Sequence, residues 1–479
     1  MQKDQRARNT VLAAVSAPAL PLAAMTLPLT IFLPQYYATK VGVNLAVVGI
    51  VFTVVRLADL IFDPMVGNLI DRTVTRFGAY KPWLVAGAPV VMAGSWMLFV
   101  PPPGASPLYL ATALIITYAG YSILVLAQMG LSSAVTHEYS ERSRVFAWWQ
   151  LFNTSGTLLV LTLPLLFSKV LGFSGDFTVP AMGGLVVVAM PITILVVLAM
   201  VPSTTRPQAV HDVRFSDFVH LLNQRSARLV IGSVALTGLA FGTSSAVFVF
   251  FYTTVKSIPT ENFSLLLIIA FIVMIAASPF WAWLGNRIGK HRALALGGIG
   301  GSTFYLTAYL VSPGNMALMT AAFVLNGFAN CAGEVMSRAM MADASDEDRL
   351  QSGNDRTGML FALLAIAIKL GQAFAIGLVF VTLDIIGFKA AAGTANSTGA
   401  LSGVAFLACL LPAAFQFGAA MLALRYPLTA ERHAEILFAL DEQSHSETRT
   451  LGAEVDPDLM AAAAQFTGRL HEEVRTDQR

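Results

Sequence analysis

Long apolar runs separated by short polar connections dominate this chain. Each run extends for about 20 residues or more, the length that an α-helix needs to cross the hydrocarbon core of a bilayer. The first run continues to about Tyr37, too long for the apolar part of a signal peptide, and is expected to remain as the first helix. The pattern predicts an all-α membrane protein with twelve spans, near residues 11–37, 44–70, 82–101, 107–134, 145–171, 177–201, 227–254, 260–285, 293–312, 315–341, 357–387 and 400–424.

Basic residues are distributed unequally among the connections between these runs. Lysine and arginine concentrate on the cytoplasmic side of membrane proteins. One alternate set of connections carries only Lys40, Lys169, Lys256 and Lys389. The other set carries Lys3, Arg6, Arg8, Arg72, Arg76, Lys81, Arg142, Arg144, Arg206, Arg214, Arg225, Arg287, Lys290, Arg292, Arg349 and Arg356. Both termini are therefore expected in the cytoplasm, as an even number of spans requires, and the protein in the plasma (bacterial inner) membrane.

The two halves of the chain repeat a segment after their second span. A shift of 215 residues superposes residues 64–72 on 279–287, with proline first and arginine last in both segments. Spans four and ten also end alike, in acidic and basic residues at 138–144 and 343–349. Two parallel six-helix halves with matched loops are typical of major-facilitator transporters. We therefore expect a six-helix bundle at 1–201, a cytoplasmic linker at 202–226, a second six-helix bundle at 227–424 and a cytoplasmic tail at 425–479.

The polar tail contains one amphipathic segment, YPLTAERHAEILFALDE. Thr429 is its candidate N-cap, and Ile436, Leu437 and Leu440 are predicted to share one face. The segment is expected to form a short cytoplasmic helix that lies on the bundle.

Composition agrees with a membrane protein and excludes several classes of function. Of the 479 residues, 56% are hydrophobic and 12% charged, against about 25% charged in soluble domains. The mean hydropathy is +0.67. The net charge of +2 provides no strong field for nucleic acid, so no nucleic-acid partner is expected. No nucleophile elbow, zinc motif or phosphate loop occurs in the connections, so neither an enzyme nor a catalytic residue is expected. Cys331 and Cys409 fall within apolar runs and are expected to be buried thiols.

Three charged residues interrupt the second apolar run. Arg56, Asp59 and Asp63 stand at helical positions i, i+3 and i+7, so they project from one side of the helix. Each charge at the bilayer centre costs about 2.5–3.5 kcal/mol on insertion scales, so this face is expected to turn inward. Two carboxylates one turn apart repel each other, and Arg56 offsets only one of them. A Na⁺ ion or a proton would supply the missing charge, which makes the pair a candidate cation-coupling site. The alternative is an inert Arg–Asp–Asp network that holds helices together.

Further charges lie in later runs. Lys369, within FALLAIAIKLGQAFAIGLVF, could pair with the carboxylates of the second span and compete with the cation. The alternative is a lysine that extends to the membrane interface. Glu334 and Arg338 form an i,i+4 pair, for which a local stabilising role and a functional role both stay open.

With these residues assembled, the chain resembles the glycoside–pentoside–hexuronide:cation symporter family, the melibiose permease-like branch of the major facilitator superfamily. The resemblance covers nearly all of both halves. It rests on the stretches RLADLIFDPMVG at 56–67, RFGAYKPW at 76–83, MMAD at 340–343, KLG at 369–371 and YPLTAER at 426–432.

The resemblance implies roles for particular side chains. Asp59 and Asp63 would bind the coupling Na⁺ or H⁺, as metal ligands if the ion is Na⁺. Ser122 stands where the family has a hydroxyl that contacts this cation. Lys369 stands at the helix-eleven lysine of the family, and Arg56 belongs to the same cation-coupling set.

The sugar-binding positions depart from the family pattern. Family members that bind galactosides hold the sugar with two aspartates and an arginine and stack a tryptophan on its ring. Ala23, Val125 and Gln150 replace the first three, and Met129 replaces the tryptophan. A free sugar needs several hydrogen bonds to replace its hydration, so a less polar glycoside or an amphipathic molecule is favoured. The expected solute-binding set is Gln128, Met129, Trp149, Gln150, Ala23 and Val125.

Together these features predict a cation-coupled symporter that moves a glycoside-like or amphipathic organic solute by alternating access. It is expected to act as a monomer in the lipid bilayer, with Na⁺ or H⁺ as its coupling ion and no cofactor. Two alternatives stay open, a lipid or lysolipid importer or flippase on the same fold and a non-transporting membrane sensor. The expected cytoplasmic gate comprises Asp71, Arg72, Arg76, Asn286, Arg287, Arg144 and Arg349.

Overall fold

The structure, a computed structural model, consists of helices and the turns that join them. No strand occurs within the residues that it describes. The expected linker 202–226 lies mostly outside these residues, as does the tail after residue 454. The described residues are 2–73, 75–135, 139–167, 171–172, 177–202, 221–353, 356–390 and 395–454.

The first apolar run forms an interrupted helix. Its segments are α1 (Gln2–Ser16), α2 (Ala19–Leu27), the π-helical turn η1 (Pro28–Phe32), α3 (Leu33–Tyr36) and a second π-helical turn, η2 (Tyr37–Val41). Proline lacks the N–H that continues a helical ladder, and Pro18, Pro28 and Pro34 lie at or beside the junctions. The first span is therefore interrupted at or beside these prolines.

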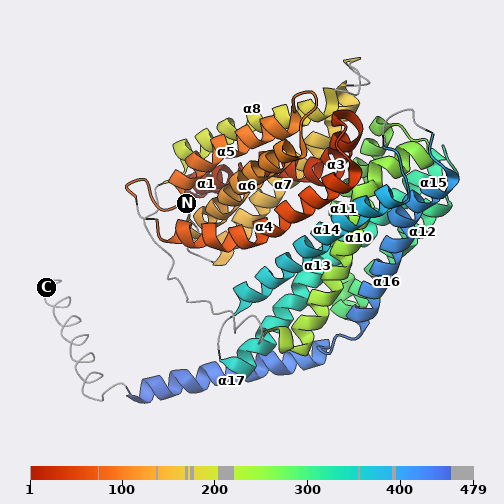
Figure 1. Ribbon diagram of the computed structural model, residues 1–479. Helices are drawn as coiled ribbons and strands as arrows, with labels where there is room; N and C mark the ends of the chain where they lie inside the picture. Colours follow the sequence, from red (N-terminus) through yellow and green to blue (C-terminus); the bar gives the residue numbers. More distant parts are fainter. Residues whose placement is uncertain are drawn as a thin grey trace.

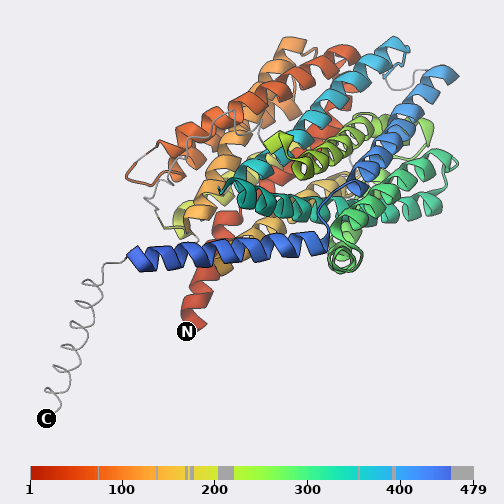
Figure 2. The ribbon, with the colours of Figure 1, turned by 90° about the horizontal axis from the view of Figure 1, so that it is seen from below.

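The other helices follow in two groups. The first group is α4 (Leu45–Asp71), α5 (Lys81–Phe99), α6 (Pro107–Val135), α7 (Tyr139–Leu165) and α8 (Thr178–Met200). The second is α10 (Arg225–Phe250) with the turn η5 (Phe251–Val255), α11 (Thr260–Ile288), α12 (Lys290–Leu310), α13 (Met316–Ser352), α14 (Thr357–Ile385), and α15 (Thr398–Ala405) continued by η6 (Phe406–Leu410) and α16 (Leu411–Leu424). Figures 1 and 2 show the second group, in green to blue, beside the first, in red to yellow. We keep the division into two six-helix units as a proposal.

Ten helices of the described part have the length and apolar composition needed to cross a membrane. Helices α7, with 27 residues, and α12, with 21, occupy the places of the expected fifth and ninth spans. They are more polar than the others because α7 begins with charged residues and α12 begins Lys290-His291-Arg292. With these two, the helices complete the twelve-span, all-α membrane fold expected from the sequence. Both Cys331 and Cys409 are free and buried, as expected.

The charged side of α4 faces the protein interior. Arg56 and Asp59 are only 9% and 6% exposed. The other side of the helix carries a stripe of apolar side chains suited to lipid contact. This stripe consists of Ile50, Val54, Ile61, Met65 and Leu69, which are between 51% and 70% exposed. The expected inward orientation of the charged face is therefore confirmed.

Helices α4 and α14 pack side by side over much of their length and join the two groups (Figure 1). Their contacts run in opposite sequence directions. The Asn44 amide donates to Asp384 at 3.0 Å, and Thr53 Oγ1 donates to the Ala373 carbonyl at 2.9 Å. Between these contacts a glycine permits close approach, because a Cβ on Gly49 would lie 2.5 Å from the Cβ of Phe380. We call this contact, from Asn44–Asp384 to Thr53–Ala373, the α4–α14 seam.

The tail helix α17 (Ala430–Glu454) is longer than the short helix expected. Thr429 Oγ1 accepts the Arg432 backbone N–H at 3.3 Å, so the expected N-cap is present. Ile436 is 1% exposed and packs on the bundle, whereas Leu437 is 46% exposed. The prediction that Leu437 shares the buried face was therefore wrong, because its position on the helix turns it away from α13.

A tyrosine just after α16 fixes the approach of the tail to the bundle. Tyr426 is 5% exposed, and its hydroxyl donates to the Met340 carbonyl on α13 at 2.7 Å. Burial raises the pKa of the Tyr426 phenol, so the group stays protonated and keeps donating this bond. The His433 ring of α17 lies 2.9 Å from Asp346 of α13. These contacts hold the start of α17 against the end of α13.

Candidate functional site

An ionic cluster forms where α4, α6 and α14 meet. The Lys369 ammonium lies between two carboxylates, 2.6 Å from Asp63 Oδ2 and 3.3 Å from Asp59 Oδ2. The Ser122 hydroxyl of α6 donates to Asp59 Oδ1 at 2.9 Å. The pairing of Lys369 with both carboxylates, expected from the sequence, is present. We call these four residues the cation cluster.

The two carboxylates of the cation cluster have different environments. The Asp59 side chain is only 4% exposed, whereas the side chains of Asp63 and Lys369 are 27% and 32% exposed. Asp59 is therefore almost inaccessible to water, whereas water and ions can reach Asp63 on its exposed side. An ion could meet the outer carboxylate before the inner one.

Arg56 lies one turn from Asp59 but pairs with a different group. Its Nη2 donates to Gln372 Oε1 on α14 at 2.8 Å, and its buried Nη1 has no hydrogen-bond partner among the described residues. Counting one charge for each of Arg56, Asp59, Asp63 and Lys369, the group sums to zero. A bound cation would therefore have to displace Lys369 or leave an excess positive charge.

The oxygen atoms of the cation cluster fit a small hard cation. Asp63 Oδ1 is buried and has no hydrogen-bond partner among the described residues, which is costly unless a ligand occupies it at some stage. Carboxylate and hydroxyl oxygens are suitable ligands for Na⁺, and either carboxylate can instead take a proton. The described residues contain no group of three or more His, Cys, Asp or Glu side chains that could hold a metal ion. The ligands that the cation cluster itself can offer to Na⁺ are the carboxylates of Asp59 and Asp63 and the hydroxyl of Ser122.

The glutamine expected to bind solute has a structural role in the first span. The break at Pro18 removes the carbonyls of Val15 and Ser16 from the helical ladder, and Gln128 Nε2 donates to both at 3.1 Å. Gln128 itself is 2% exposed. Its amide therefore satisfies backbone groups that could not otherwise find water within a membrane.

The other expected solute positions are distributed between the interior and open space. Ala23 is 4% exposed and packs within the core, and Val125 is half-buried against it. Trp149 is half-buried, and Met129 is 46% exposed. Gln150 is exposed, and its amide donates to Thr154 Oγ1 at 3.0 Å. These positions on the first half thus offer few free hydrogen-bonding groups to a solute.

Replacing Gln128 by leucine is expected to lower stability rather than solute affinity. Two backbone carbonyls would lose their donor, and an unsatisfied buried polar group typically costs about 1–3 kcal/mol. We therefore expect a lower Tm for Gln128→Leu with an unchanged KM. Gln150→Leu, at an exposed position of α7, is the control and should change Tm little. A raised KM at unchanged Tm would instead place the Gln128 amide in contact with solute.

Within the described part of the chain, no hydrogen bond, ion pair or ring contact of the expected gate residues joins the two groups of helices. Arg72, Asn286 and Arg349 are exposed. Arg76 and Arg287 are exposed too, and each stacks on an aromatic ring of its own segment, at 4.7 Å from Phe77 and 5.1 Å from Trp283. Arg144 donates to Asn9. The side chain of Asp71 lies outside the described residues. Their assignment as a gate stays a prediction.

The structure adds polar residues that the sequence reasoning did not select. Gln372 bonds Arg56, and Asn326, Asn330 and Gln416 line a cavity of about 360 Å³ within the second group of helices. Each is a polar residue inside an apolar run, and Asn326, Asn330, Glu334 and Arg338 recur at intervals of four. That spacing was a usable signal, because it places all four on one side of a helix.

Comparisons with known proteins agree on one class of membrane protein. The family model described as MFS/sugar transport protein matches residues 14–430. A lactose permease of Leuconostoc lactis is 24% identical over 463 residues, covering 91% of this chain and 71% of its own length. A putative glycoside/cation symporter of Escherichia coli is 22% identical over 444 residues, covering 91% of this chain and 94% of its own. The crystal structure of the nucleoside transporter NupG, at 12% identity, superposes with a TM-score of 0.60 over 88% of this chain and 98% of its own, so the two share a fold.

Proposed function

Because this chain belongs to the MFS/sugar transport protein family, we propose that it is a cation-coupled symporter that moves a glycoside across the membrane. As a member of that family the protein is a membrane transporter and not an enzyme. The relatives named as a lactose permease and a glycoside/cation symporter support both the solute class and the coupling. The inner membrane, cytoplasmic termini and action as a monomer are part of the proposal.

One observation carries the coupling, the position of Lys369 between Asp59 and Asp63. Its ammonium occupies the place where a cation would be held by the same two carboxylates. An arriving Na⁺ or proton neutralises a carboxylate and weakens its attraction for Lys369. Because Lys369 is on α14 and the carboxylates are on α4, this exchange alters the contact between the two groups of helices. Cation binding and rearrangement are thereby linked.

Solute movement follows from alternating closure at the two ends of this helix pair. In this structure the α4–α14 seam is closed, while the expected gate residues at the other end are exposed. The opposite state would separate the seam and bring together the segments around Arg72 and Arg287. The lysine of the cation cluster lies between these regions and can respond to both.

The two alternatives have less support. A lipid importer or flippase would require an apolar opening toward the bilayer, and the relatives are named as sugar and glycoside carriers rather than lipid carriers. A non-transporting sensor would bind solute with an affinity independent of sodium and pH.

Uptake into proteoliposomes tests the proposal. We expect a 4-nitrophenyl glycoside of glucose, galactose, xylose or glucuronic acid to accumulate under an inward Na⁺ or H⁺ gradient. A tenfold gradient of one coupling ion provides about 1.4 kcal/mol, enough for about tenfold accumulation at one ion per solute. Protein-free liposomes are the control, and the gradient that drives accumulation identifies the ion. Equilibration without accumulation under both gradients would refute a symporter.

A further inference from the structure

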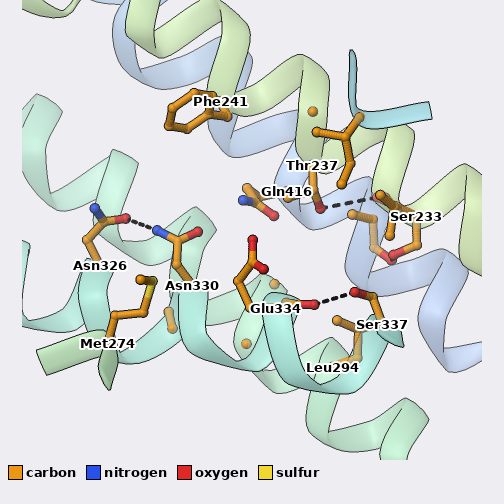
Figure 3. A pocket seen from close by; sticks show the side chains of 18 of the residues that line it. Ser233, Thr237, Phe241, Met274, Leu294, Asn326, Asn330, Glu334, Ser337 and Gln416 are labelled. Atoms are coloured by element: carbon orange, nitrogen blue, oxygen red, sulfur yellow. Dashed lines mark hydrogen bonds between the residues drawn. The ribbon is translucent and has the colours of Figure 1, made fainter. Parts of the chain in front are cut away.

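A cavity of about 360 Å³ penetrates the second group of helices (Figure 3). It is lined by side chains of α10, α11, α12, α13, α14 and α16, and Leu27 and Ile31 border it from the first span. Pockets for small organic molecules commonly have about 300–1,000 Å³. The cavity is thus large enough for a small glycoside and is bordered by both halves of the chain.

Polar groups of α13 form a row along this cavity. Asn326, Asn330, Glu334 and Arg338 follow at intervals of four residues, and all four line it. Asn330 Nδ2 donates to Asn326 Oδ1 at 2.6 Å, which leaves the Asn330 carbonyl and the Asn326 amide hydrogens available to a ligand. Glu334 and Arg338 pair at 2.6 Å and cancel each other in charge, although their side chains stay 55% and 60% exposed. The row therefore offers donors and acceptors without net charge.

A buried glutamine faces the same space from another helix. Gln416 of α16 is 6% exposed and makes no hydrogen bond with any described residue. Figure 3 shows its amide pointing toward Asn330 and Glu334. Because Gln416 lines the cavity, its amide is open to that space and can both donate and accept hydrogen bonds with a ligand there.

Apolar side chains complete the lining. Leu27 and Ile31 lie on the first span, and Phe241, Phe271 and Met274 lie on α10 and α11. Phe241 is 42% exposed, so its ring is open to contact with a ligand. A ligand that fits must combine a hydroxyl-rich part, for the amides, with an apolar part.

We propose that this cavity binds the transported solute, a neutral glycoside whose sugar hydroxyls pair with Asn326, Asn330 and Gln416. This site rests on the proposed function and moves sugar recognition from the first half of the chain to the second. Each sugar hydroxyl can donate and accept a hydrogen bond, and carboxamides provide both partners. The altered positions Ala23, Val125 and Met129 are then explained, because the polar contacts to the sugar come from the other half.

The cavity also touches the charged region of α4 through one residue. Gln372 lines the cavity and accepts the hydrogen bond from Arg56 at 2.8 Å. It follows Lys369 by three residues on α14, so both lie on the same side of that helix. A solute in the cavity would thus contact the helix that also carries the lysine of the cation cluster.

Filling the cavity tests the site without disturbing its walls. A Cβ on Gly333, which lines the cavity, meets no atom within 4 Å, so Gly333→Leu places its side chain in open space. The matched control is Gly184→Leu on α8, where a Cβ also meets no atom within 4 Å. With the 4-nitrophenyl glycoside that accumulates best, we expect at least a tenfold higher half-saturating concentration for Gly333→Leu and no change for Gly184→Leu. The thermal stabilisation of both variants by the coupling cation alone should equal that of the unaltered protein.

A second variant separates solute binding from folding. Gln416→Met keeps the volume of the side chain and removes its hydrogen-bonding groups. We expect a Tm without glycoside equal to or above that of the unaltered protein, and at least a tenfold loss of glycoside affinity. A lowered Tm with unchanged affinity would show that Gln416 is structural and would overturn the site.

The outcomes also separate the site from the function. Normal affinity in both Gly333→Leu and Gln416→Met, in a protein that still accumulates the glycoside, would overturn the cavity while leaving the symporter in place. Accumulation of the glucuronide alone would overturn a neutral ligand. Failure of the unaltered protein to accumulate any of the four glycosides would overturn the proposed function itself, and the cavity site with it.

Discussion

Replacing Asp59 by asparagine is expected to abolish accumulation of solute against its gradient. The asparagine side chain would have nearly the same shape but could neither take a proton nor supply a charge to Na⁺. Lys369, 3.3 Å from Asp59 and 2.6 Å from Asp63, would then balance Asp63 alone. Without a cation-dependent change at this contact, the ion gradient no longer drives uptake, whereas exchange of solute across the membrane can persist. The measurement is gradient-driven uptake and solute exchange in proteoliposomes.

Ser122→Ala provides the graded comparison for Asp59→Asn. It removes one hydrogen bond to Asp59 and keeps both carboxylates, so its effect should be smaller. A hydrogen bond to a charged group contributes about 1.5–3 kcal/mol, which corresponds to roughly 10- to 150-fold in cation affinity at most. Accumulation by Ser122→Ala should therefore recover at higher cation concentration.

Unchanged sodium- or proton-driven accumulation in Asp59→Asn would refute the coupling role of Asp59.

Replacing Gly49 by leucine is expected to keep the α4–α14 seam from closing. Its Cβ alone would lie 2.5 Å from the Cβ of Phe380, which cannot move without its backbone. Overpacking of this kind costs about 1–3 kcal/mol, which shifts a two-state equilibrium by about 5- to 150-fold. The protein would therefore favour the state with an open seam, and uptake should fall by about 5- to 150-fold.

Labelling of an introduced cysteine reports the position of the seam directly. Ala373 is 0% exposed in the closed seam, so Ala373→Cys should react slowly with a water-soluble maleimide. Combined with Gly49→Leu, its labelling rate should rise by about 5- to 150-fold, whereas the Gly184→Leu control should leave it unchanged. Slow labelling together with lost uptake would indicate damage unrelated to the seam.

The core of the candidate site could be predicted because charged residues within an apolar run leave few possible orientations for their helix. Arg56, Asp59 and Asp63 share one side of a helix by spacing alone, and the cost of exposing them to lipid requires an inward face. Lys369 is a positive charge within a distant apolar run that offers it no acidic neighbour, so the sequence favours its pairing with the carboxylates of the second span. The structure contains both pairs, in which Lys369 contacts Asp59 and Asp63 from 310 and 306 residues away in the sequence.

Other residues have neighbours that spacing in the sequence does not reveal. Gln128 was expected to face solute, but the proline break in the first span exposes two carbonyls beside it. Leu437 was expected on the buried face of the tail helix, but α13 contacts only the side that carries Ile436. In each case the sequence shows the residue, but its partner depends on how other helices pack against it.

The sequence by itself determined the spans, the proline interruptions of the first helix and the inward side of α4. These follow from interactions within one segment, namely backbone hydrogen bonding, the missing N–H of proline and the cost of charge in lipid. Only the tertiary structure decided which helix faces which. It put Gly49 against Phe380, joined Gln372 to Arg56 and left a cavity beside Gln416. Such contacts depend on the shapes of surfaces from segments far apart in the chain, and no local periodicity encodes how two of them fit.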